Sequence, residues 1–510
     1  MVLGAITAFM AAFGIGANDV ANAFATSVGS KALTVKQACA LAVIFEFLGA
    51  TFLGGAVVKT IRKGIADVSF FENDPALLMW GCLCVIAAVT FWLLLASRLE
   101  MPVSTTHSCV GGMIGMAIAA RGAQAVIWQK DTTDFPFQKG FAGVVISWFL
   151  SPFASGCLSM LFFFLIRKFI LRSARPFDRA VLIYPILVSV CVTIVTLFML
   201  MKGIKSSSDI KEMEIGVKIG ISFGVGAGVG ILGIPLYMML KKRIVDGKFV
   251  PPPLAIEVAD ERAKNMTEIK VEEPPPTKMG KFLKAVGTSL NTDPHAAVGV
   301  DARTTEVHRN AEKFDKNAEA FFTYLQVFSA IFDAFAHGAN DVANAVGPFA
   351  TIYVVYTTGV VSSKADMGDH KYWILALGGV GIGFGLLLYG YQILRAIGVK
   401  LAVITPSRGF CIEMGSSLVV IIGAHLGWPL STTHCQVGAT AGVAALEGFK
   451  GCNGWVLFKT FFGWIFTCFF VGVLAAVFFS LGAYAPSIHG SAASCATFVS
   501  AALVSNQTGS

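Results

Sequence analysis

Apolar stretches of roughly 18 residues or more recur along the chain, and they restrict its fold more than any other feature. Such a stretch has the length of a helix that crosses the ~30 Å hydrocarbon core of a bilayer. The chain is 55% hydrophobic and only 14% charged, whereas soluble domains carry about 25% charged residues. The sequence therefore predicts an all-α polytopic membrane protein.

The order of the apolar stretches gives the expected spans. The first stretch contains Asn18 and Asp19, which the core of a signal peptide would avoid, so we interpret it as a retained span. Two further apolar regions, 76–120 and 402–446, are each split by a charged or proline-containing break. Spans are expected near residues 2–27, 36–60, 141–165, 180–201, 216–240, 319–355, 372–394 and 454–485.

Cysteine usage and net charge exclude other classes of function. The 11 cysteines lie mostly in apolar stretches without CxxC pairs, which favours small buried side chains over metal or disulfide chemistry. The net charge of +8 is best explained by cytoplasmic loops rather than by nucleic-acid binding.

Two motifs occur twice and in the same order. Gly16–Ala23 reads GANDVANA and returns as Gly338–Ala345, while Met101–His107 (MPVSTTH) returns as Trp428–His434 (WPLSTTH). The second motif follows the first at nearly equal spacing, which predicts two homologous halves of several helices each.

The halves define the domain organisation. We expect a first transmembrane half at 1–240, a second at 319–485, and a tail at 486–510. Residues 241–318 are polar, proline-rich and mixed in charge, which is typical of a flexible linker. Basic residues in 166–179 and at the start of the linker predict that both segments are cytoplasmic.

Each Pro-Ser-Thr-Thr region is interpreted as a re-entrant helical hairpin that enters and leaves on one side. Counting spans outward from the cytoplasmic linker then places both termini outside and gives the two halves opposite orientations. Inverted-topology repeats of this kind are typical of secondary transporters.

The Asn-Asp-x-x-Asn core of the first motif places polar side chains at membrane depth. On a helix, Asn18 and Asp19 share a face with Asn22, three or four residues on. Carboxylate and amide oxygens suit an alkali cation, whose charge would offset the cost of burying the acid. The alternative is that the amides only join helices by hydrogen bonds, but recurrence of the ionisable residue as Asp341, beside Asn340, favours a functional site.

The Pro-x-Ser-Thr-Thr-His motif suits the start of a helix. Proline and a capping serine fit the first turn, so half-helices are expected to begin near Ser104 and Ser431. Free N–H groups, hydroxyls and the positive end of the helix dipole would attract a phosphate or a carboxylate. Simple capping at a kink is the alternative for either copy alone.

Two other acids and three histidines also lie in the apolar stretches. Glu46 and Glu413 are interpreted as cation ligands or proton carriers, with a structural carboxyl as the alternative. His337 stands before the second GANDVANA and could tune that site by protonation, with a structural histidine as the alternative. His107 and His434 lack clustered partners in the sequence, so neither is interpreted as a metal ligand.

The paired motifs around a long loop resemble the inorganic phosphate transporter (PiT) family of Na⁺- or H⁺-coupled symporters. Gly29, Val35–Ala38 and Phe45-Glu46 resemble its eukaryotic members. The resemblance implies an inverted-repeat transporter whose hairpin tips meet near the midplane, and many family members form homodimers. It implies that phosphate is bound by Ser104, Thr105, Thr106, Ser431, Thr432, Thr433, Asn22 and Asn344. It implies cation coupling by Asp19, Asp341, Glu46 and Glu413. The residue pattern itself adds Asn18 and Asn340 as expected cation ligands and His337 as a residue that could tune the site.

The resulting hypothesis is a Na⁺-coupled phosphate symporter of the plasma membrane that works by alternating access. Coupling to H⁺ and a phosphate-sensing receptor with the same site remain alternatives. An ion channel would not need saturable, cation-dependent uptake. An enzyme is not expected, because no nucleophile–base set or transition-metal cluster accompanies the two aspartates. The expected partners are phosphate, Na⁺ or H⁺ and the lipid bilayer, with no cofactor besides the coupling ion.

Overall fold

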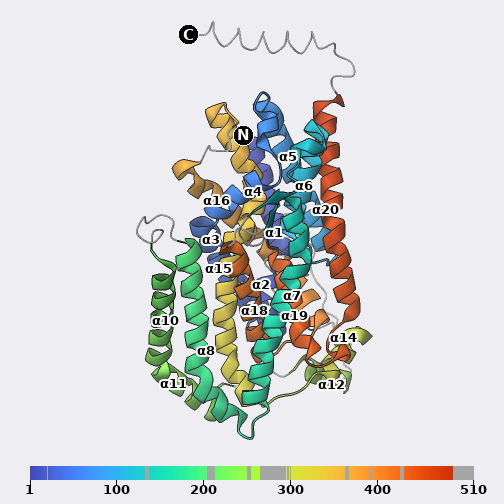
Figure 1. The fold of residues 1–510 in the computed structure, drawn as a ribbon. Helices are drawn as coiled ribbons and strands as arrows, with labels where there is room; N and C mark the ends of the chain where they lie inside the picture. Colours follow the sequence, from blue (N-terminus) through green and yellow to red (C-terminus); the bar gives the residue numbers. More distant parts are fainter. Residues whose placement is uncertain are drawn as a thin grey trace, which may run out of the picture.

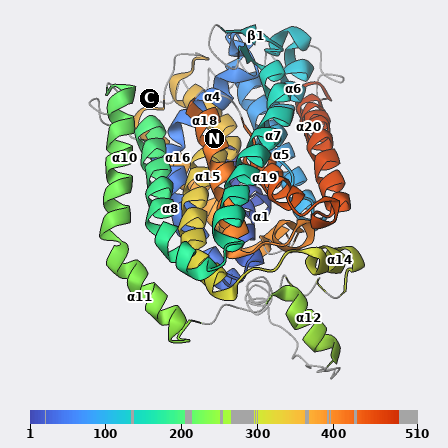
Figure 2. The same cartoon turned by 60° about the horizontal axis from the view of Figure 1, so that its bottom comes forward.

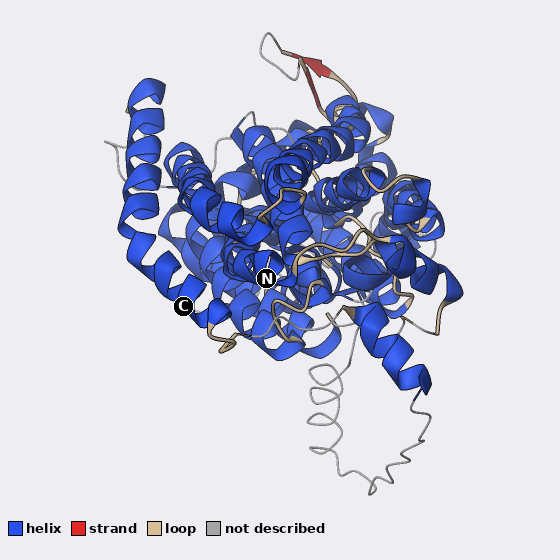
Figure 3. Ribbon diagram, turned by 90° about the horizontal axis from the view of Figure 1, so that it is seen from below, coloured by secondary structure: helices blue, strands red, loops and turns tan. Residues whose placement is uncertain are grey.

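A bundle of long helices makes up nearly all of the described structure (Figure 1). The computed structural model describes residues 1–19, 21–132, 137–203, 213–249, 254–264, 295, 298, 300–361, 367–390, 393–394, 396–425 and 430–485. Within these residues, the strands are one short antiparallel pair, β1 (Lys130–Asp131) and β2 (Gln138–Lys139), which projects from the bundle (Figure 3).

Helices of the first half follow the predicted spans. They are α1 (Val2–Asn18), α2 (Ala21–Gly29), α3 (Val35–Leu53), α4 (Gly55–Gly64), α5 (Pro75–Arg98), α6 (Thr105–Arg121), α7 (Phe141–Ile166), α8 (Pro176–Phe198), α10 (Ile215–Leu232) and α11 (Ile234–Val245). Short turns η1 (Val68–Phe71) and η2 (Ala123–Ala125) connect some of them, and the π-helical turns η3 (Arg167–Leu171) and η4 (Met199–Gly203) extend α7 and α8.

The second half contains fewer helices in the part of the chain that the structure describes. Its helices are α15 (Lys316–Thr358), α16 (Lys371–Tyr389), α18 (Pro406–His425), α19 (Thr432–Ala445) and α20 (Gly454–Ala483). The turns η6 (Gly368–His370), η7 (Ala396–Leu401) and η8 (Phe449–Gly451) join them. The split regions of the sequence are thus the pairs α5–α6 and α18–α19, with each break just before a Ser-Thr-Thr motif.

Eight helices of the described chain are long and apolar enough to cross a membrane. Large apolar side chains are exposed on the outer faces of α7, α8, α10 and α20, for example Phe153, Leu182, Leu232 and Phe469. Exposed apolar side chains on such helices suit lipid and would be unfavourable in water. The chain is therefore a multi-pass integral membrane protein, as predicted.

The two halves pack across each other rather than side by side. Helix α6 lies against α20, and α19, which begins at the second Ser-Thr-Thr motif, lies against α7. In the same manner α1 packs on α16, while α15 packs on α3. Helices α8, α10 and α11 stand at one edge, shown in green in Figure 2.

The first glycine of each GANDVANA motif lies at one of these crossings. A Cβ on Gly16 would collide with the backbone carbonyl of Ile382 in α16, and a Cβ on Gly338 with that of Glu46 in α3. Only glycine allows helices to approach this closely. The first motif also breaks its helix, since α1 ends at Asn18, whereas the second motif lies inside the continuous α15.

Parts of the predicted linker are helical. Helices α12 (Ala255–Lys264) and α14 (Ala302–Asn310) lie at one end of the bundle (Figures 1 and 2). Residues 265–294 and the tail 486–510 lie outside the described residues, so the prediction of a flexible linker stays a prediction there.

Candidate functional site

Both Ser-Thr-Thr motifs start a helix, as predicted. The Ser104 hydroxyl accepts a hydrogen bond from the His107 backbone N–H at 3.2 Å and caps α6. Ser431 accepts from the His434 N–H at 3.4 Å and caps α19 in the same way. All six hydroxyl residues of the two motifs are buried. The first turns of α6 and α19 therefore carry hydroxyls and a positive dipole end inside the protein.

Asp19 joins the first Asn-Asp motif to the first turns of α6 and α19, called here the two tips. Its Oδ2 accepts a hydrogen bond from the Thr105 hydroxyl at 2.7 Å. Its other oxygen accepts from the hydroxyl of Thr433, which lies 414 residues away in the chain. Thr433 also lies 3.4 Å from the carbonyl oxygen of Val103. The two tips thus touch each other and share one buried carboxylate.

Asp341 makes the equivalent connection from the second motif. It accepts hydrogen bonds from Thr432 at 2.7 Å, from Asn344 at 3.2 Å and from Asn340 at 3.1 Å. Asn344 also donates to Thr105 across the halves at 3.1 Å. Both motifs and both tips therefore converge on one site.

His337 connects a third acid to this site. Its Nε2 lies 2.8 Å from an oxygen of Asp341, and its Nδ1 lies 3.1 Å from an oxygen of Glu46. Asp19, His337 and Asp341 each offer a ligand atom within 4.8 Å of the other two. Three carboxylates beside a single imidazole form a concentration of negative charge, and a buried charge of this kind must be neutralised, by bound protons or by a cation.

The first asparagine of the two motifs has a different role in each copy. Asn18 accepts from the Val103 N–H at 2.9 Å and donates to the Met101 carbonyl at 3.0 Å and to the Ser97 hydroxyl at 3.2 Å. These bonds hold the segment between α5 and α6, just before the first tip. Asn340 is half-buried and donates to the neighbouring Asp341.

Two predicted positions stand apart from this cluster. The backbone of Asn22 lies in α2, but its side chain lies outside the described residues. Glu413 is fully buried in α18, where it accepts hydrogen bonds from Thr26, Ser27 and Ser329. The structure therefore places Glu46 in the Asp341 cluster and Glu413 in a second polar group between α2, α15 and α18.

Sequence reasoning missed several side chains near the site. The rings of His107 and His434 lie edge to face at 4.5 Å, so the histidines do have each other as partners. Asp333 accepts a hydrogen bond from Ser417 at 2.7 Å, one helical turn from His337. The i, i+4 spacing of Asp333, His337 and Asp341 was the available signal, since it places all three on one helix face.

Comparisons with known proteins find relatives along nearly the whole chain. The phosphate transporter family profile matches residues 15–475. A putative phosphate permease of Pyrococcus abyssi is 32% identical, over 94% of this chain and 97% of its own length. The phosphate-repressible phosphate permease of Neurospora crassa is 30% identical, over 95% of this chain and 98% of its own. Sodium-dependent phosphate transporter 1 of Homo sapiens is 29% identical, over 90% and 92%.

A solved structure has a similar fold. It is described as the sodium-dependent phosphate transporter, and it superposes with a TM-score of 0.70 at 29% identity. The match covers 94% of this chain and 98% of the other.

Proposed function

The chain belongs to the phosphate transporter family, and from this premise we propose that it carries inorganic phosphate across a membrane together with Na⁺. The observation that carries the proposal is the convergence of both hairpin tips on Asp19 and Asp341. Two helix N-termini with hydroxyls attract an anion, while the carboxylates between them attract a cation. A site for both ions at once is what a symporter requires.

The hydrogen bonds of the site suggest why the ions are coupled. A threonine hydroxyl has one hydrogen to donate. The Thr105 and Thr433 hydroxyls donate theirs to Asp19, so neither can donate to phosphate at the same time. Na⁺ bound to Asp19 would neutralise the carboxylate and release both hydroxyls. Phosphate would then bind beside a neutralised carboxylate, whereas without the cation the negative charge of Asp19 would repel it.

Phosphate would be held by the hydroxyls and N–H groups of the two tips and by the asparagine amides. In the same manner, a second cation bound to Asp341 would release the hydroxyl of Thr432. The proposed phosphate ligands are Ser104, Thr105, Thr106, Ser431, Thr432, Thr433, Asn22 and Asn344. The proposed cation ligands are Asp19, Asp341 and Asn340. Glu46 would act on the cation site through His337, and Asn18 would hold the first tip. Glu413 would contribute to coupling from its separate polar group.

Crossed packing of the halves supports inverted-topology repeats with two re-entrant hairpins. Each contact between the halves has a counterpart with the two halves interchanged: α6–α20 corresponds to α19–α7, and α1–α16 corresponds to α15–α3. This pattern is expected when one half is turned over relative to the other. Alternating access would then be a rocking of the two hairpins about the shared site. In this arrangement the linker is cytoplasmic, both termini are extracellular, and the protein acts in the plasma membrane as a homodimer.

The available driving force is sufficient for uphill transport. Each net positive charge that moves through 100 mV supplies about 2.3 kcal/mol. A tenfold Na⁺ gradient adds about 1.4 kcal/mol per ion.

Uptake of radiolabelled phosphate into proteoliposomes tests the proposal. We expect accumulation with an inward Na⁺ gradient and none with K⁺ in its place. Accumulation driven by a pH gradient alone would indicate H⁺ coupling instead. If neither gradient drives accumulation, the transport proposal is wrong.

Two aspartate variants test the site. Asp19→Asn and Asp341→Asn should abolish Na⁺-driven uptake, because each removes a charge that attracts the cation while keeping the side-chain shape. Asp74→Asn is the matched control, since Asp74 is exposed and paired with Arg121 outside the site. Normal uptake by either site variant, in folded protein, would contradict the cation assignment.

A further inference from the structure

A row of polar side chains, all buried except the half-buried Asp333, leads away from the central site along one face of α15. Its members follow each other at intervals of three or four residues, which keeps them on one face. Over this part of α15 the helix rises about 33 Å. The row consists of Asp341, His337, Asp333, Ser329, Gln326, Thr323 and Glu319.

Polar groups from α2 and α18 face this row. Ser417 of α18 donates a hydrogen bond to Asp333, and Ser329 donates one to Glu413 of α18. Nearer the end of the row, Ser30 donates to Gln326 at 2.7 Å. The carboxylate of Glu319 at the end accepts three hydrogen bonds, one from Thr405 at 2.9 Å and two from Ser407. Buried helix faces in a membrane protein are normally apolar, so polar groups from three helices in one line point to a passage for water or ions.

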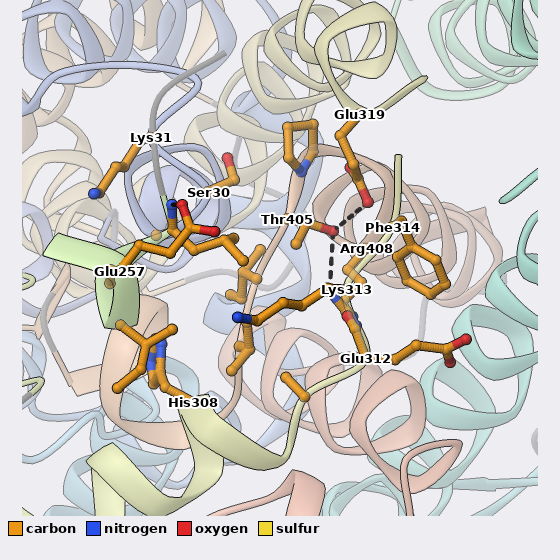
Figure 4. A pocket seen from close by; sticks show the side chains of 18 of the residues that line it. Ser30, Lys31, Glu257, His308, Glu312, Lys313, Phe314, Glu319, Thr405 and Arg408 are labelled. Carbon is orange, nitrogen blue, oxygen red and sulfur yellow. Dashed lines mark hydrogen bonds between the residues drawn. The ribbon is translucent and has the colours of Figure 1, made fainter. Parts of the chain in front are cut away.

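The row ends in a cavity of about 100 Å³, which is large enough for several water molecules. Ser30, Thr323, Glu319 and Thr405 belong to both the polar path and the cavity wall. The cations lining the cavity are Lys31, Lys313, Lys316 and Arg408, and the acids are Glu257, Glu312 and Glu319. The Lys313 side chain extends across the cavity (Figure 4). The balance of charge is positive, which suits an arriving or departing anion.

Helices α12 and α14 of the linker cover this cavity. Ile256 of α12 is buried against Val298 and against Val399 of η7. His308 of α14 lies with Nε2 3.0 Å from the Val399 carbonyl oxygen, and Glu257 lies 3.4 Å from the Lys316 ammonium. Among the described residues, the apolar cluster that joins α12 to η7 is small. A cover held by a small apolar cluster and by polar contacts can detach without unfolding the bundle.

We propose that the polar row is the route by which the transported ions reach the linker side, that the cavity is its vestibule, and that α12 and α14 form a lid over the vestibule. This inference rests on the proposed transport function. It adds a path between α2, α15 and α18, and it gives the linker a gating role.

Cysteine modification tests the route. Thr323→Cys places a thiol of similar size in the cavity wall, and Glu306→Cys places one on the exposed face of α14. Each variant is treated in detergent with sulfonatoethyl methanethiosulfonate, analysed by peptide mass spectrometry, and then reconstituted. We expect modified Thr323→Cys to lose at least tenfold in phosphate uptake and modified Glu306→Cys to lose none. Full uptake by completely modified Thr323→Cys would overturn the route.

A second pair of variants tests the lid. Ile256→Asp, in the Thr323→Cys background, removes the apolar contact with Val399 and should speed modification at least tenfold. Glu261→Gln, on the exposed face of the same helix, should leave the rate unchanged. Equal rates in the two variants would overturn the lid. If unmodified protein shows no gradient-driven uptake, the transport function itself fails, whereas the modification rates still decide whether the lid exists.

Discussion

Asn18→Ala is the substitution for which the structure predicts the sharpest result. Asn18 is fully buried and makes three hydrogen bonds, to the Val103 N–H, the Met101 carbonyl and the Ser97 hydroxyl. Alanine removes all three and leaves a buried backbone N–H without its acceptor. Asn340 holds the same place in the second motif but donates to its neighbour Asp341. Asn340→Ala is therefore a matched control.

The expected magnitude follows from these bonds. A hydrogen bond inside a protein contributes about 1 kcal/mol net, and more when its loss leaves a buried partner unpaired. Three bonds give about 3 kcal/mol, or roughly a hundredfold in an equilibrium constant. For Asn340→Ala, with one bond at a half-buried position, we expect about 1 kcal/mol or less.

The assay is the free energy of unfolding in detergent, measured without Na⁺ and phosphate. Under these conditions the loss of an ion-binding side chain does not contribute, so the difference between the variants reports the hairpin contacts alone. Asn18→Ala should be less stable than Asn340→Ala by about 2 kcal/mol. Equal stability of the two variants would refute the assignment of Asn18 to the hairpin.

Two further predictions concern the helix crossing and the lid. Gly338→Ala should lower the stability by about 1–3 kcal/mol because its methyl would press on the Glu46 carbonyl, while Gly216→Ala, with open space around it, should not destabilise the protein in the same unfolding assay. Burial, with smaller effects from neighbouring cations, lowers the pKa of His308 from 6.5 to about 4, so the detached lid binds a proton more readily than the docked lid. Docking of the lid should therefore be unaffected above pH 6.5 and should weaken by up to about 3 kcal/mol as the pH falls from 6.5 to 4. Spin-label distances between α14 and the core measure the docked fraction. His308→Gln should remove the pH dependence.

Local features of the structure could be predicted from the sequence. Apolar stretches gave the spanning helices, and Ser104 and Ser431 marked the starts of α6 and α19, because capping depends on a few adjacent residues. The duplicated acids Asp19 and Asp341 could be identified because an ionisable residue at membrane depth is costly.

Features that depend on distant contacts could not be predicted. The same eight residues end α1 at Asn18 but lie within the continuous α15, so the surroundings outweigh local preference. Asn18 and Asn340 differ for the same reason, since only Asn18 lies beside the backbone before a hairpin tip. The bond between Thr433 and Asp19 joins residues whose separation in the chain carries no signal.

Crossed packing of the halves also has a consequence for biogenesis. Helix α6 has completed synthesis long before its packing partner α20 emerges, and at about 10 residues per second the interval is on the order of half a minute. During this time Asp19 has no Thr433 to bond, and the glycine face of α1 has no α16 to cover it. The first half must therefore persist in the membrane as an incomplete intermediate with exposed polar groups.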